Sequence, residues 1–369
     1  MAPRAPSRWR RVAVSAGAVA LAGAAIAWVL TQPVMSGLVL PGISLPGAEP
    51  TLGPPASGGS GPSLRDITKR AVDEGEVDVY WPGQLSEDWR KKFEAAYQLE
   101  FQTSIALKVT ASRNTMPAND IATMNRAVQA GQQPAWDAFL GSDAEFAALA
   151  RDGLLRQREW QPMFGAAREA MLFNGGAVSF AQSILQPAYN SQKAAPASWD
   201  ALLDPPWKGR LGVASSAGIW ATLSGTWGDE RTASFVQGLA GQQPALGTAS
   251  ELERRLEDGA IDAIAAQPAE LAKGKAAAAD VQPLILRSYY AATIVNARHP
   301  NAAILFAGFL LTQEGQKLWL QYAGQSSIYV PGSPAQQYVA DKQVAKADGG
   351  LLLGDWAARE THYAKLLGL

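Results

Sequence analysis

Cysteine is absent from this chain, and histidine occurs only twice among its 369 residues. Without a thiol, the protein cannot use a thiolate nucleophile, form a disulfide, bind a metal through cysteine or carry the acylated cysteine of a lipoprotein. Two histidines argue against a histidine metal cluster, and His299 directly precedes Pro300, which favours a role at a helix start. We therefore expect no bound metal and no cofactor.

An excess of charge of one sign is also lacking, as are familiar catalytic motifs. Lysine and arginine number 32 against 33 aspartates and glutamates, and this balance gives no indication of a nucleic-acid partner. No GxSxG, HExxH, Walker A or GxGxxG pattern stands out. What the chain has is an apolar fraction of 47% and enough length for two domains with their own cores.

The first 31 residues have the pattern of an export signal. Four arginines within residues 4–11 precede the uncharged run 12–30, which is long for a signal peptide and just long enough to span a bilayer. Ala25 and Ala27 form a weak small-x-small cleavage site, so residues 1–31 are a signal peptide or a retained signal anchor. By the positive-inside rule, everything after this segment lies outside the cytoplasm.

A linker follows this segment. Residues 32–61 are rich in Pro, Gly and Ser and cannot bury enough apolar surface to offset the entropy of ordering them. We assign residues 32–74 to a flexible linker, with the globular part beginning between residues 64 and 75.

From residue 75 onward, short apolar runs alternate with helical patterns, which predicts α/β layering. The first series alternates strands with helices and is typical of a lobe with a doubly wound sheet. Its expected strands are 77–81, 105–110 and 136–140, and its expected helices are 86–97, 121–130 and 143–150.

A second α/β series begins after the extended run 177–189. Its expected elements are a strand at 211–214, helices after 218, at 233–239 and at 251–257, and a strand at 260–265. A further extended run at 285–295 leads to helices at 299–311 and 314–323.

Two sequence motifs in this second half carry a family resemblance. The segments YNSQK at 189–193 and SWDALLDPPWKGR at 198–210 resemble the pattern "YN…P.SW.DLLDP.WKG". The segments HPNAA at 299–303 and FLLTQEGQ at 309–316 are similar to "HPNAA…FLLSPEGQ". Both patterns are typical of bacterial extracellular solute-binding proteins of ABC importers of the iron(III), polyamine and phosphonate type. Most of the motif residues have the spacing of packing residues.

The resemblance implies an α/β protein with the two-lobed, periplasmic-binding-protein-like type II fold. Its lobes close on a small-molecule solute, and an ABC permease in the cytoplasmic membrane receives it. We expect a monomer in the periplasm or at the cell exterior, tethered to the membrane if the N-terminal helix is retained. By this analogy, crossing strands at 177–187 and 285–296 join lobe one (75–178 with 290–330) to lobe two (179–289), and residues 331–369 form a C-terminal helical extension.

Ligands of open α/β sheets bind beyond the carboxyl ends of the strands. In lobe two this rule favours the small residues 215–218, where a helix N-terminus could hold an anion, although an ordinary serine cap explains them equally well. Arg113 could pair with the same anion or be a solvated loop residue, and the two candidate tryptophans could stack on a solute or belong to the core. The expected ligand-binding residues are Trp81, Gly83, Gln84, Ser112, Arg113, Ser142, Asp143, Ser215, Ser216, Trp220, Gln267 and Tyr289.

Iron binding is disfavoured at one position. Ferric-binding members of the family generally have adjacent tyrosines after the strand expected here at 260–265, whereas this chain has Ala266-Gln267-Pro268. Its only tyrosine pair, Tyr289-Tyr290, lies in the second crossing strand, where alternation sends the two rings to opposite sides.

Four functions therefore remain open. The first is a receptor for an anionic or organic solute, and the second is a ferric-ion-binding protein of the same family. The third is a membrane-tethered sensory or scaffold domain, which a cleft blocked by side chains would favour. The fourth is an enzyme on the same fold, which a buried carboxylate with a strongly shifted pKa between the lobes would favour.

Overall fold

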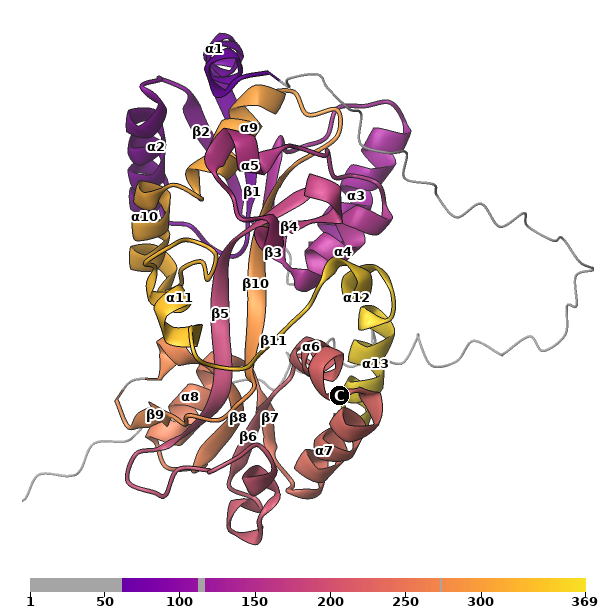
Figure 1. The fold of residues 1–369 in the computed structure, drawn as a ribbon. Coiled ribbons are helices and arrows are strands. Elements are labelled where there is room, and N and C mark those ends of the chain that lie inside the picture. Colours follow the sequence, from indigo (N-terminus) through magenta and orange to yellow (C-terminus); the bar gives the residue numbers. More distant parts are fainter. Residues whose placement is uncertain (1–61, 112–116, 273) are drawn as a thin grey trace, which may run out of the picture. The chain divides into compact units, whose positions relative to one another are not determined.

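The computed structural model describes residues 62–111, 117–272 and 274–369, all within one compact unit, Ser60–Leu369, in which helices surround a mixed sheet (Figure 1). The N-terminal segment 1–31 and most of the linker lie outside the described residues. Among the helices that are described, none has the length and apolarity needed to cross a membrane.

Helix α1, Leu64–Glu74, occupies a stretch that the sequence pattern places in the linker. Ser63 and Asp66 form a capping box at its start, and Gly75 ends it in the left-handed conformation. Ile67 and Ala71 are buried against the first lobe. Two apolar residues one turn apart, behind a capping box, are a short signal that the surrounding Pro and Gly content obscures.

The first lobe has the alternating order predicted from the sequence. Strand β1 lies between β2 and β3 and is parallel to both. The elements are β1 Glu76–Trp81, α2 Glu87–Phe101, β2 Ala106–Ala111, α3 Pro117–Gln129, β3 Ala138–Ser142 and α4 Asp143–Arg151, followed by the short α5 Trp160–Phe164 and β4 Met171–Leu172.

Two long strands run from the first lobe into the second (Figure 1). They are β5, Ala177–Asn190, and β10, Leu284–Thr293, and they pair antiparallel. Strand β10 also pairs with β3, and β5 also pairs with β8, so the sheet order is β2-β1-β3-β10-β5-β8-β6-β7. The crossing segments predicted at 177–187 and 285–296 therefore coincide with the strands that join the two halves of the sheet.

The second lobe repeats the parallel α/β arrangement, with β6 between β7 and β8. Its motif residues pack as expected: Trp199 and Leu202 are buried, and Trp199 Nε1 donates to the Pro283 carbonyl. The motif segment forms two 3₁₀ turns. The elements are β6 Leu211–Ala214, α6 Gly218–Trp227, α7 Asp229–Gly241, β7 Ala245–Gly247, α8 Ala249–Glu257, β8 Ala263–Pro268 and β9 Ala276–Ala278, with turns at Asp200–Leu203 and Pro205–Trp207.

The chain then returns to the first lobe before it ends on the second. Helices α9, Pro300–Phe309, and α10, Gln313–Ala323, supply residues of the first core, including Trp319. The C-terminal extension contains α11 Pro334–Val339, α12 Gly349–Leu353 and α13 Trp356–Leu367, and also a strand, β11 Val344–Lys346. Strand β11 pairs parallel with β10, and α13 packs on α6 and α7.

Candidate functional site

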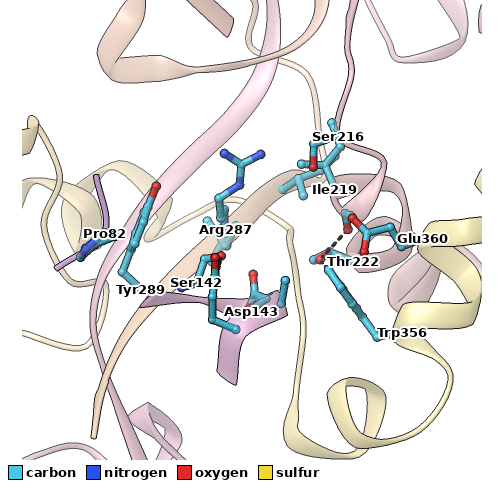
Figure 2. A pocket seen from close by; sticks show the side chains of 15 residues that line it. Pro82, Ser142, Asp143, Ser216, Ile219, Thr222, Arg287, Tyr289, Trp356 and Glu360 are labelled. Carbon is cyan, nitrogen blue, oxygen red and sulfur yellow. Dashed lines mark hydrogen bonds between the residues drawn. The ribbon is translucent and has the colours of Figure 1, made fainter. Parts of the chain in front are cut away.

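A cavity of about 350 Å³ opens where elements of both lobes, a crossing strand and the C-terminal helix converge (Figure 2). The ends of β1 and β3 form one wall, the start of α6 with α13 forms the opposite wall, and β10 contributes between them. The lining residues are Pro82, Ser142, Asp143, Ala144, Glu145, Ser216, Gly218, Ile219, Thr222, Ile285, Leu286, Arg287, Tyr289, Trp356 and Glu360.

The first wall is built by the start of α4. Ser142 donates from both its backbone N–H and its Oγ to Glu145 Oε2, at 2.9 and 2.5 Å, which fixes the carboxylate at the mouth of the helix. Asp143 is almost fully buried beside it and accepts a 2.8 Å hydrogen bond from the Tyr290 hydroxyl. Burial raises the pKa of Asp143 to about 7, although the bond from Tyr290 and the nearby Arg287 oppose the rise.

The opposite wall joins the start of α6 to α13. The Glu360 carboxylate lies beside the first residue of α6, since a Cβ on Gly218 would come within 3.1 Å of Glu360 Oε1, so a side chain of this protein already occupies the N-terminus of α6. Trp356 lies against the same turn, and its Nε1 donates to Thr222 Oγ1 at 3.4 Å. Burial raises the pKa of Glu360, and the negative charge of Glu145 raises it further.

Strand β10 supplies the cation of the cavity. Arg287 and Tyr289 are two residues apart, and both line the cavity, as the alternation of a strand requires. Figure 2 shows the Arg287 guanidinium in the space between Tyr289 and Ser216. Within residues 62–111, 117–272 and 274–369, no hydrogen bond or ion pair engages this guanidinium. It is therefore available to a bound group.

The tyrosine pair divides as the strand alternation predicts. Tyr289 lines the cavity and contacts the first-lobe core, whereas Tyr290 is 2% exposed and packs in a separate cluster with Phe146 and Phe139. Burial and the neighbouring Asp143 raise the pKa of Tyr290 well above its ordinary value, which keeps its hydroxyl protonated as a donor. Only Tyr289 offers a phenol to a solute.

Four of the residues expected to bind ligand line this cavity: Ser142, Asp143, Ser216 and Tyr289. Trp81 and Trp220 are fully buried in the first and second cores, and Gln267 is buried in β8 beside Gln186. The others do not line it either. Gly83 forms a turn with φ +84°, and the Gln84 carbonyl accepts a hydrogen bond from the Tyr322 hydroxyl. Ser215 donates its N–H to the Gly247 carbonyl. Ser112 and Arg113 lie outside the described residues.

Three charged residues of the cavity, Arg287, Glu145 and Glu360, are not among the residues predicted from the sequence. Arg287 interrupts the apolar run of β10. An isolated charge in a buried strand indicates a functional residue, but Arg287 does not stand at the end of a strand, where ligand-binding residues were expected. Glu145 belongs to a capping box and reads as a structural residue. Trp356 and Glu360 come from α13, whose position in space nothing in its own sequence indicates.

His299 has the helix-start role that its position before Pro300 predicts. Its N–H donates to Asp137 Oδ1 at 2.9 Å, and its Nδ1 lies 2.7 Å from Asp137 Oδ2. The small number of histidines did not indicate a metal site, but ligand atoms of Glu76, Asp78 and His299 lie within 4.8 Å of one another. Glu76 is already paired with Lys108 at 2.6 Å. This group lies away from the cavity.

Comparison with known proteins identifies the family. Residues 84–323 match the model of the bacterial extracellular solute-binding protein family, which is more than half of the chain. The chain belongs to this family. As a solute-binding protein of this kind, it serves an ABC importer, with a small solute and a membrane permease as its partners. A search of curated proteins found no match.

Solved structures show the same fold at low sequence identity. Iron-bound HitA from Pseudomonas aeruginosa is 20% identical, with a TM-score of 0.62 over 80% of this solute-binding protein and 99% of HitA. The Trichodesmium protein IdiA (FutA), in complex with iron and citrate, is 12% identical, with a TM-score of 0.65 over 79% and 99% of the two chains. The Bordetella ferric binding protein is 13% identical, with a TM-score of 0.63 over 79% and 98%.

Proposed function

We propose that this protein captures a small organic solute with an anionic group in the cavity between its lobes and presents it to an ABC permease, without catalysing a reaction. The observation that carries the proposal is the free guanidinium of Arg287 in a cavity of about 350 Å³. A guanidinium binds carboxylate or phosphonate oxygens through charge-assisted hydrogen bonds. Ser142, Ser216 and Tyr289 add hydroxyl groups around it.

The position of Arg287 couples binding to lobe closure. It lies on β10, which pairs with β3 of the first lobe and with β5, which continues into the second. A solute held by Arg287 that also contacts both walls favours the closed state, since binding shifts the population toward the form with more contacts. An open polar cavity also supports a receptor rather than a scaffold with a blocked cleft.

Two alternatives have a specific observation behind them. The ferric-ion alternative draws on the iron-bound structures of similar fold, but this cavity contains one tyrosine, and Gln267 stands where the ferric-binding pattern has its pair. The enzyme alternative draws on the raised pKa of Asp143. Asp143 is engaged by Tyr290, and the hydroxyl of Ser142 is engaged by Glu145, so neither serves as a free acid–base pair.

We extend the proposal to the cellular setting. The arginines and the apolar run of residues 1–31 support a signal anchor that keeps a monomeric receptor near its permease, where tethering raises the effective concentration. Fractionation of cells that produce the full chain tests this point: we expect it in the membrane fraction at full length, and a shortened soluble form would indicate cleavage.

The test of the solute class uses calorimetric titration and thermal unfolding of the full-length protein with carboxylates, phosphonates, polyamines, ferric citrate and ferric ion. An organic anion should raise the melting temperature, because a ligand that binds only the folded state stabilises it. Arg287→Gln should weaken that binding by about 1.5–3 kcal/mol, which is roughly tenfold or more. Arg254→Gln, on an exposed face of α8, is the matched control.

Two results would contradict the proposal. The first is binding of ferric ion alone with an affinity that Arg287→Gln leaves unchanged. The second is the absence of a shift with every ligand class.

A further inference from the structure

The charges of the cavity define the solute further, on the basis of the function proposed above. We infer that the solute is amphoteric: its anionic group binds Arg287, and a cationic group, such as an ammonium, binds between Glu145 and Glu360. The cavity would then take amino-acid-like molecules in preference to simple acids.

The first step is the charge inventory. Among the residues that the structure describes, three carboxyl groups line the cavity, those of Asp143, Glu145 and Glu360, against one guanidinium, that of Arg287. Even with Asp143 protonated, two carboxylates face one cation. A solute with only negative charge would leave an excess of negative charge in a site that loses water on closure, where like charges repel most strongly.

The second step is the capacity of the two glutamates. An ionised carboxylate offers about four acceptor positions on its two oxygens. Glu145 accepts from the N–H and the hydroxyl of Ser142, both on Oε2, and its other oxygen accepts no bond from the described residues. Glu360 Oε1 lies beside Gly218 at the start of α6. Both carboxylates therefore keep positions for a donor with several N–H groups.

The third step is their placement on opposite walls. Glu145 belongs to α4 of the first lobe, and Glu360 belongs to α13, which packs on the second-lobe helices α6 and α7. Burial raises the pKa of Glu360, and the negative charge of Glu145 raises it further. A cation between them removes this repulsion and links the two lobes.

The fourth step shows why the anionic group of the solute binds Arg287 and not the N-terminus of α6. The sequence favoured residues 215–218 as an anion site because a helix N-terminus offers free N–H groups. Here Glu360 Oε1 and the ring of Trp356 both lie against Gly218, the first residue of the helix. A solute anion would have to displace an intramolecular carboxylate there, whereas the guanidinium of Arg287 is free.

The experiment compares molecules that differ in one charge. Calorimetric titration of the full-length protein uses the ω-amino acids glycine, β-alanine, γ-aminobutyrate and ε-aminocaproate, each beside the acid without the amine and the amine without the acid. We expect at least one amino acid to bind about tenfold or more tightly than both of its singly charged partners, because each removes one charge-assisted contact.

Two variants then assign the cationic end. Glu145→Gln keeps a carbonyl oxygen that accepts from Ser142, and Glu360→Gln keeps the size of the side chain beside Gly218, so both variants remove charge with little change of shape. Each should weaken the amino acid about tenfold and leave the matched acid unweakened. Glu314→Gln, on the exposed start of α10, makes the same charge change outside the cavity and should have no effect.

Each outcome distinguishes the inference from the function beneath it. A simple acid that binds as tightly as its amino acid, and loses binding in Arg287→Gln, overturns the amphoteric solute and leaves the receptor in place. Amino-acid binding that persists in both glutamine variants also overturns it. Binding of neither acids nor amino acids counts against both proposals. Without ligand, a higher melting temperature of Glu360→Gln at neutral pH supports the repulsion, and an unchanged one contradicts it.

Discussion

Asp143 is almost fully buried at the cavity wall, and burial raises the pKa of its carboxyl group from an ordinary value of 3.8 to about 7. The folded protein therefore holds a proton that the unfolded chain releases between these pH values. Protonated Asp143 contributes most to the free energy of unfolding below pH 3.8. Between pH 3.8 and about pH 7 this contribution falls by up to about 1.4 kcal/mol per pH unit, and above about pH 7 it is lost.

Asp143→Asn should remove this pH dependence, since an amide oxygen still accepts from the Tyr290 hydroxyl without carrying charge. We expect the variant to gain about 2.7 kcal/mol relative to the natural protein between pH 5 and pH 8, since two pH units separate pH 5 from the folded pKa. Chemical denaturation at several pH values measures the difference. Asp341→Asn, at an exposed aspartate, should give a constant offset, and a constant offset for Asp143→Asn as well would contradict the raised pKa.

At this scale the sequence predicted part of the site. Ser142, Asp143 and Ser216 were found because they follow strands, and the loops after parallel strands meet at one edge of the sheet. The same rule selected Trp81, which is the last residue of β1 and faces inward like Val77 and Val79. The end of a strand therefore predicts where a residue lies. Whether its side chain faces the cavity or the core depends on the alternation of side chains along the strand.

At the scale of elements, the contact of α6 with α13 rests on the absence of a side chain at Gly218. A Cβ there would lie 2.7 Å from Trp356 Cζ2 and 3.1 Å from Glu360 Oε1. Gly218→Ala should push α13 away from α6 and lower the free energy of unfolding by about 1–3 kcal/mol, the usual cost of overpacking. Denaturant titration followed by far-UV circular dichroism measures the loss of stability.

Gly241 provides the matched control for this substitution. Gly218 is the first residue of α6, and Gly241 is the last residue of another second-lobe helix, α7, where a Cβ would meet no atom within 4 Å. Gly241→Ala should therefore be neutral or stabilise the protein by about 0.5–1 kcal/mol, because alanine loses less backbone entropy on folding. Equal losses of stability in the two variants would show that helix geometry, rather than the contact with α13, explains the effect at Gly218.

Most elements could be predicted because their signals are local. Alternation of strands and helices, the apolar crossing segments and the caps at Ser86 and Thr312 all lie within a few residues of the elements they define. The location of α13 at the cavity could not be predicted. It depends on contacts with α6 that are more than 130 residues away in the chain, such as the hydrogen bond between Trp356 and Thr222.

At the scale of the whole molecule, the sequence motifs predicted more than the physical patterns alone. Periodicity predicted two α/β series, and only the resemblance indicated that two strands cross between them. The structure explains why the crossing segments appear as long apolar runs: all but one of the residues of β5 are buried, since the strand has neighbours on both edges. A buried strand shared by two lobes constrains where they can move relative to each other.

Lobe closure on a solute should therefore leave a signature on both walls at once. Hydrogen exchange of the full-length protein, with and without a saturating ω-amino acid identified by titration, should slow at residues 142–145 and 216–222 and at 356–360. Helix α1 does not line the cavity, and its rate of hydrogen exchange should be unchanged. Arg287→Gln at the same ligand concentration should lose the protection. Protection confined to one wall would mean that the solute binds without drawing the lobes together, since closure requires that Glu145 and Glu360 both gain a partner.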